Sequence, residues 1–275
     1  MKQYKHLIKP YVIWAVLLLV IPLFLIALYA FTEEGNEVLT LSFTLENFAK
    51  FAEATYLNVI LKSFKLGIIT TVICLVLGYP LAFMISRYSE KVQNILIMLV
   101  TIPMWINLLL RTYAWMNLLA DNGIINHILE YLGIGSISMM YTDFSVILGL
   151  VCNFMPFMII PIHTSLSKMD RSLIEAAYDL GANKIQTFCK VIWQLSIPGV
   201  LNGIMMVFLM AISSFVIPKL LGGGQYMLIG NLIESQFISV GNWNFGSAIS
   251  LILAVVILIF MGLMKRMDKQ EKQDD

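Results

Sequence analysis

The chain has 275 residues, of which 59% are hydrophobic and only 13% are charged, and its mean hydropathy is +0.82. Soluble domains carry about 25% charged residues, so this composition excludes an ordinary cytosolic enzyme. The formal net charge of +1 gives no indication of nucleic-acid binding. The three cysteines and three histidines are not paired at ligand spacing, so no metal site is predicted.

Six stretches of the sequence are apolar enough to cross a membrane, because a bilayer core of about 30 Å requires about 20 apolar residues per helix. Their approximate limits are 10–31, 66–86, 94–116, 143–166, 199–221 and 245–264. The first stretch is longer than the apolar core of a signal peptide, so we expect it to be retained. The sequence therefore predicts an all-α protein with six transmembrane helices in one domain, residues 1–275.

The charge distribution predicts the orientation of these helices. With the N-terminus in the cytoplasm, most Lys and Arg residues fall in inner segments, as the positive-inside rule requires. We therefore expect both termini to be cytoplasmic. The outer segment 117–143 then contains three acidic residues and no Lys or Arg, which favours an electronegative outer face that attracts cations. The positive-inside rule removes Lys and Arg from outer loops, so an excess of acidic residues there can also arise without a function. Attraction of cations and this simple consequence of topology therefore both stay open.

Few polar side chains lie within the predicted helices. Arg111, near the outer end of the third, either snorkels or joins a structural ion pair, or it forms a gating pair with an outer carboxylate. Trp105 and Tyr113 either offer ring faces to a cation or belong to an interfacial aromatic belt. His163, in the fourth helix, is expected to be a hydrogen-bonded structural residue. Gly199 and Gly203 form a GxxxG pair that either allows close helix approach or occurs by chance.

Catalysis by this chain is not expected. No Asp or Glu lies well within a predicted span, and the GxxxxGK[ST] loop that binds ATP phosphates is absent. If the protein uses ATP, another chain must bind it.

The longest inner connection, about residues 167–197, is predicted to form two short helices. Ser172 and Glu175 fit a capping box, an apolar stripe follows at helical spacing, and Gly181 is placed to end the first helix. The second helix is expected from about Asn183 to Trp193. This hairpin either fits the groove of a partner protein or lies on lipid.

The first helix of the hairpin carries a known motif. Glu175-Ala176-Ala177-Tyr178-Asp179-Leu180-Gly181 matches the EAA motif of the membrane-spanning subunits of binding-protein-dependent ABC importers. Five other stretches are similar to the spermidine/putrescine permeases of that superfamily. They are Leu77–Ala82, Leu110–Trp115, Asn122–Gly123 with Asn126, Pro156–Met158 and Leu220–Gly223. One departure is Gln194, which stands where members usually have proline.

The resemblance implies a type I ABC importer (MetI-like) permease fold in the bacterial inner membrane. It implies ATP-driven import of polyamines by alternating access, with a second homologous permease, two cytoplasmic ABC ATPase subunits and an external substrate-binding protein as partners. ATP and Mg would be held by the ATPase, and this chain would bind no cofactor. The residues implied to couple the permease to the ATPase are Ser172, Glu175, Ala176, Ala177, Asp179, Leu180 and Gly181. Candidate path-lining residues are Trp105, Asn107, Arg111, Tyr113, Asn153, Ser213 and Ser214.

Three alternatives remain at this stage. An importer of another small solute, such as an organophosphonate or a metal chelate, would share the same motifs. A multispan membrane enzyme would need an internal catalytic pair, and a passive channel would conduct without ATPase subunits.

Overall fold

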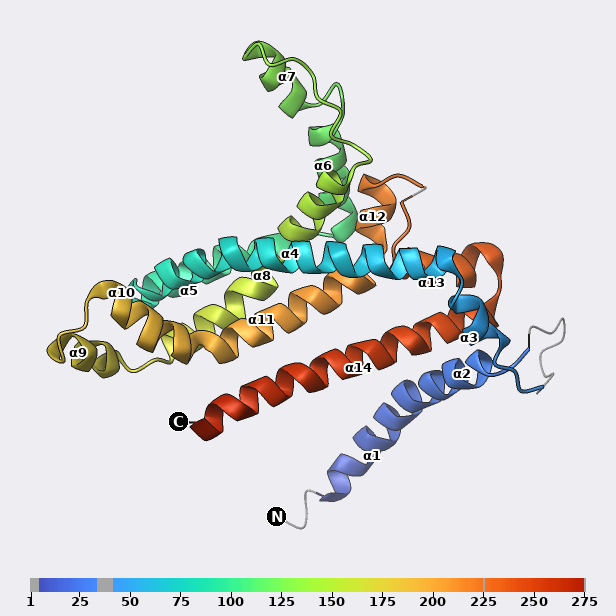
Figure 1. Ribbon diagram of the computed structural model, residues 1–275, viewed down its shortest axis with the longest axis horizontal. Coiled ribbons are helices and arrows are strands. Elements are labelled where there is room, and N and C mark those ends of the chain that lie inside the picture. Colours follow the sequence, from blue (N-terminus) through green and yellow to red (C-terminus); the bar gives the residue numbers. More distant parts are fainter. Residues whose placement is uncertain (1–4, 34–41, 225, 275) are drawn as a thin grey trace. The chain divides into compact units, whose positions relative to one another are not determined.

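The computed structural model describes residues 5–33, 42–224 and 226–274, and Figure 1 shows its helices in chain order. Within these ranges the regular structure is helical apart from one isolated β-bridge, between Thr32 and Phe43. The all-α prediction is confirmed. The chain divides into two compact units, one made of the segment before residue 60 with residues 232–259, and the other made of residues 60–231 with the segment after residue 259.

The helices of the first unit are α1 (Lys5–Ala15), a π-helical turn (Val16–Val20), α2 (Ile21–Ala30), α3 (Glu46–Phe51) and a π-helical turn (Ser235–Val240). Those of the second unit are α5 (Glu90–Trp105), α6 (Leu108–Leu119), α7 (Ile124–Tyr131), α8 (Asp143–Ser167), α9 (Arg171–Asp179), α10 (Lys184–Thr187), a π-helical turn (Phe188–Ile192), α11 (Trp193–Ser213) and α12 (Val216–Leu221). The helices that contribute residues to both are α4 (Ala54–Ser86), α13 (Ile229–Glu234) and α14 (Trp243–Asp274).

Five helical segments of the described chain are long and apolar enough to cross a membrane. They are Pro10–Ala30, Ala54–Ser86, Asp143–Ser167, Lys184–Ser213 and Trp243–Arg266. Each overlaps one of the predicted stretches. A sixth candidate is a bent pair, Glu90–Trp105 and Leu108–Tyr131, whose two parts differ in direction by 89°.

The third predicted span, 94–116, differs from the expected single helix. The chain is extended at Ile106, where ψ is 137°, and a new helix begins one residue after Asn107. The Asn107 side chain accepts a hydrogen bond of 2.8 Å from the Leu109 N–H, so it caps the start of α6. The break therefore has a local cause, a capping asparagine within an otherwise apolar stretch.

The fifth predicted span, 199–221, also differs in its limits. The continuous helical segment begins at Lys184 and ends at Ser213, and Ser214 is extended, with ψ of 135°. The Asn231 side chain donates a hydrogen bond of 2.7 Å to the Phe215 carbonyl, which satisfies an acceptor next to the break. Residues 216–221 then form the separate short helix α12.

The core of the second unit depends on close packing of α8 against α11. A β-carbon at Gly203 would lie 2.7 Å from the Met158 sulfur, and one at Gly199 would lie 2.6 Å from the Pro161 carbonyl oxygen. The GxxxG pair is therefore a close-approach site. Ile162 and Val207 are fully buried in the same core.

Replacing Gly203 with leucine is expected to reduce the free energy of unfolding by about 1–3 kcal/mol, because overpacking forces α8 and α11 apart. The measurement is the thermal unfolding midpoint of the purified protein in detergent. Gly262→Leu is the matched control, since a β-carbon at Gly262 meets no atom within 4 Å. Equal midpoints for the two variants would contradict the assigned role of Gly203.

Candidate functional site

The hairpin predicted between the fourth and fifth spans is present, but its first helix begins differently from the prediction. The N-cap of α9 is Asp170, whose carboxylate accepts a hydrogen bond of 2.9 Å from the Ser172 N–H. That hydrogen bond lowers the pKa of the Asp170 carboxyl below its ordinary value. The predicted Ser172–Glu175 capping box is wrong, because Ser172 is already inside the helix and a better acceptor precedes it.

The end of α9 is as predicted. Gly181 has a φ of +82°, its N–H donates to the Tyr178 carbonyl at 2.9 Å, and the Ala182 N–H donates to the Ala177 carbonyl at 3.0 Å. These two bonds define a Schellman motif, in which glycine avoids the steric cost of a left-handed backbone. The EAA segment thus ends in a tight, fixed turn.

The hairpin exposes apolar side chains. Leu180 is 89% exposed and Ile185 is 76% exposed, and Leu173 and Tyr178 are also exposed. Of the other motif residues, Glu175, Ala176 and Asp179 are exposed and Ala177 is half-buried. Burial of apolar surface is favourable, so this face of α9 and the turn after it is suited to contact with a partner.

The second arm of the hairpin is joined to a span without a break. Asn183 caps α10 and forms a capping box with Gln186, with both hydrogen bonds at 2.9 Å. The helix then passes through the π-helical turn into α11, so the separate helix expected at 183–193 is the first part of a 30-residue segment. Gln194 retains the backbone N–H that proline would lack, which favours this continuity.

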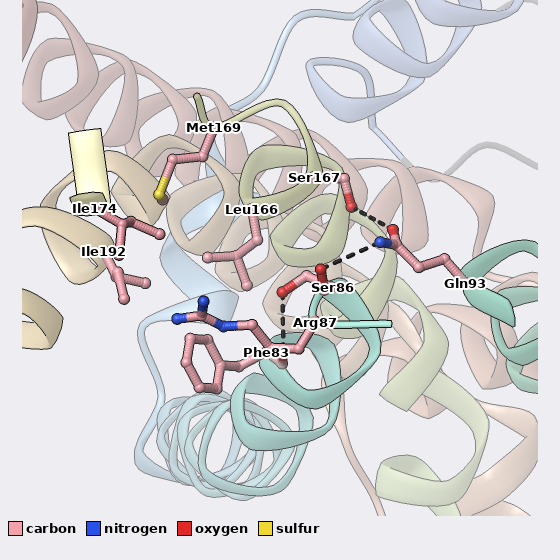
Figure 2. Close-up of a pocket in the computed structure, with 9 residues that line it drawn as sticks. All are labelled: Phe83, Ser86, Arg87, Gln93, Leu166, Ser167, Met169, Ile174 and Ile192. Carbon is pink, nitrogen blue, oxygen red and sulfur yellow. Dashed lines mark hydrogen bonds between the residues drawn. The ribbon is translucent and has the colours of Figure 1, made fainter. Parts of the chain in front are cut away.

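A small cavity of about 70 Å³ lies where α4, α5, α8, α9 and the π-helical turn Phe188–Ile192 meet at the base of the hairpin. Figure 2 shows the Gln93 side chain between Ser86 and Ser167. The Gln93 amide donates to the Ser86 and Tyr88 carbonyls at 3.2 and 2.8 Å, and its oxygen lies 3.0 Å from both Ser167 Oγ and His163 Nε2. The expected structural role of His163 agrees with these contacts, which tie α5 to the end of α8.

The candidate path residues fall into three separate places. Trp105 and Asn107 lie at the bend between α5 and α6, and Arg111 and Tyr113 follow within α6. Asn153 is buried within α8, and Ser213 and Ser214 lie at the end of α11. Among the described residues, no hydrogen bond joins any two of these seven side chains, and several bond only locally: Asn107 to Leu109, Asn153 to Gly149 and Ser213 to Leu209.

Arg111 remains the unusual member of this set. Its Nε and Nη1 atoms are buried and have no hydrogen-bond partner within the described part of the chain. No ion pair or cation–π contact of Arg111 is formed there, so neither the structural ion pair nor the gating pair has a partner among the described residues.

The structure shows a polar cluster that sequence reasoning missed. Lys62 of α4 lies with its ammonium 3.6 Å from the centroid of the Tyr226 ring and 3.9 Å from Asp143 Oδ1. The Tyr226 hydroxyl donates to the same Asp143 oxygen at 2.6 Å. Burial, and then Asp143, raise the pKa of the Tyr226 phenol, so the hydroxyl stays protonated. No local sequence signal connects these residues, because Asp143 and Tyr226 are 83 positions apart.

Comparison with known proteins identifies the family. The model of the binding-protein-dependent transport system inner membrane component matches residues 75–273. The spermidine/putrescine transport system permease protein PotB of Escherichia coli (strain K12) is 39% identical over 254 residues, covering 91% of this chain and 91% of that protein. PotB of Haemophilus influenzae is 38% identical over 259 residues, covering 93% and 91%.

A solved structure has the same fold. It is a bacterial alginate ABC transporter in complex with an alginate pentasaccharide-bound periplasmic protein, with a TM-score of 0.81, 16% identity, and coverage of 98% of this chain and 96% of that one. The relatives and the apolar helices together make this a multi-pass protein of the bacterial inner membrane, and a transport subunit rather than an enzyme. The chain belongs to the binding-protein-dependent transport system inner membrane components, the permease subunits of ABC importers.

Proposed function

We propose that this chain is a permease subunit of an ATP-driven importer of polyamines such as spermidine and putrescine. The observation that carries the proposal is the 39% identity to PotB permeases across 91% of the chain, because those relatives are named for that substrate. The acidic segment 117–143, which contains Asp121, Glu130 and Asp143 and no Lys or Arg, supports a cationic cargo.

The proposed topology has both termini in the cytoplasm and one permease domain over residues 1–275. Its six spans correspond to the stretches predicted from hydropathy, except that the third is the bent pair Glu90–Trp105 and Leu108–Tyr131 and the fifth lies within the segment Lys184–Ser213. The cytoplasmic coupling loop is proposed at about residues 167–197, and its second arm is the beginning of that segment. The Lys and Arg distribution supports this orientation, since Arg87, Lys168, Lys190 and Lys265 then lie on the inner side.

The proposed assembly contains a second homologous permease, two cytoplasmic ABC ATPase subunits and an external substrate-binding protein. ATP and Mg belong to the ATPase chains, and this chain holds neither. The family description, which names a binding protein, supports the external partner.

The hairpin is proposed to seat α9 in a cleft of an ATPase subunit. Glu175 makes a charged contact there, Ala176 and Ala177 allow close approach, and Gly181 makes the turn; Ser172, Asp179 and Leu180 complete the contact surface. The exposure of Leu180 and Leu173 supports this role, because both apolar side chains are open to a partner.

Transport is proposed to follow alternating access. When the two ATPase subunits bind ATP and close, they draw the coupling helices together and the outer cavity opens. Hydrolysis and product release then return the permease to the inward-open state. The unbroken Lys184–Ser213 segment supports such coupling, because a displacement of the hairpin moves a whole span. The path is proposed to include Trp105, Asn107, Arg111, Tyr113, Asn153, Ser213 and Ser214.

Replacing Gly181 with aspartate is expected to reduce ATP-dependent uptake at least about tenfold while the protein stays in the membrane. A β-carbon at this positive φ costs roughly 1 kcal/mol, and the new charge disturbs the docked turn. Gly133→Asp is the matched control, since Gly133 has a φ of +77° and ends α7 with the same pair of hydrogen bonds. Normal uptake by an intact Gly181→Asp complex would refute the coupling role.

The transport activity is tested with the purified importer in proteoliposomes, supplied with its external binding protein. We expect accumulation of labelled spermidine or putrescine that requires ATP in the compartment of the ATPases. Organophosphonate and metal-chelate cargoes serve as comparisons. Uptake of one of these instead of polyamines would overturn the substrate assignment, and flux without ATP would overturn the importer assignment.

A further inference from the structure

The cluster of Lys62, Asp143 and Tyr226 has the chemistry of an ammonium-binding site. A cation within about 6 Å of an aromatic centroid is attracted by the ring face, and the Lys62 ammonium lies 3.6 Å from the Tyr226 centroid. A carboxylate supplies the opposite charge, and Asp143 Oδ1 is 3.9 Å from the same nitrogen. The ring and the carboxylate are held together by their own hydrogen bond of 2.6 Å, so they form a fixed pair without the lysine.

The lysine is the replaceable member of this cluster. Its ammonium makes no hydrogen bond with any described residue, and its contact with Asp143 is an ion pair of 3.9 Å. The side chains of Lys62 and Asp143 are 41% and 56% exposed, and ion pairs this open to solvent are weak. Asp143 Oδ2 makes no hydrogen bond with any described residue, so an acceptor remains for a second N–H donor.

The space next to the cluster can hold a longer molecule. An open cavity of about 640 Å³ borders Tyr226 and is also lined by Tyr141 and Met116. Tyr141 has a φ of +62°, a conformation that non-glycine residues seldom adopt, and its N–H is fixed by a 2.9 Å hydrogen bond to the Leu221 carbonyl. This strained residue brings a second aromatic ring to the same cavity. Lys219 also lines the cavity, and the carboxylate that can neutralise an ammonium group is Asp143, which is hydrogen-bonded to Tyr226.

We propose that Asp143 and Tyr226 form the subsite for one primary ammonium end of a linear polyamine, and that Lys62 occupies this subsite as an internal substitute until the substrate arrives. A lysine side chain is four methylene groups ending in a primary ammonium, which is the same group that ends putrescine and one arm of spermidine. The inference rests on the proposed function and orientation, which place the start of α8 on the outer side.

The test is equilibrium binding of radiolabelled putrescine to the purified permease–ATPase complex without the external binding protein. Lys62→Met keeps the apolar stem and removes the competing ammonium, so the apparent Kd is expected to fall about fivefold, as it does when a blocked site is freed. Asp143→Asn in the Lys62→Met background is expected to raise the Kd at least about tenfold, because the charged acceptor is lost.

Lys65→Met is the matched control, since Lys65 lies on the same helix, is exposed, and takes no part in the cluster. General electrostatic attraction predicts the same small change for both lysine variants. Equal Kd values for Lys62→Met and Lys65→Met, weaker binding by Lys62→Met, or no measurable putrescine binding would overturn the inference. ATP-dependent polyamine uptake by the wild-type importer is measured in parallel, and its absence would instead refute the proposed function.

Discussion

The structure depends on one constraint, that backbone N–H and C=O groups within a bilayer must find partners inside the protein. Long helices meet it, and where a helix stops inside an apolar stretch a side chain provides the missing bond. Asn107 accepts from the Leu109 N–H at the bend between α5 and α6, and Asn231 donates to the Phe215 carbonyl after α11. These breaks are therefore specific features of the sequence.

The same requirement explains which parts of the fold the sequence predicts. Five apolar stretches of about twenty residues are strong signals, and each overlaps a long helix of the described chain. The helix end at Gly181 follows from a motif and a backbone preference. Helix starts are less predictable, because Ser172 and Asp170 are both good caps and only the structure distinguishes them. The hydropathy pattern does not predict the break at Ile106, because it is averaged over about twenty residues and the break depends on one residue, Asn107, which caps α6.

Contacts between distant segments could not be predicted. Gln93 and His163 are 70 positions apart, and Asp143 and Tyr226 are 83 apart; each pair meets only because α8 packs among its neighbours. One cluster fixes the base of the hairpin, and the other lies at the opposite end of α8. Both clusters therefore include a residue of α8, one near each end of this helix.

We propose above all that the hairpin tip is a cytoplasmic contact surface for an ATPase. Leu180, which is 89% exposed, is replaced with cysteine in a background in which Cys152 and Cys189 are replaced with serine. The remaining cysteine, Cys74, is buried. The rate of alkylation at position 180 by a membrane-impermeant maleimide is then measured. We expect reaction in inside-out vesicles but not in intact cells, and at least about tenfold slower reaction when the ATPase subunits are bound. Reaction from the outside, or equal rates with and without the ATPases, would contradict the account.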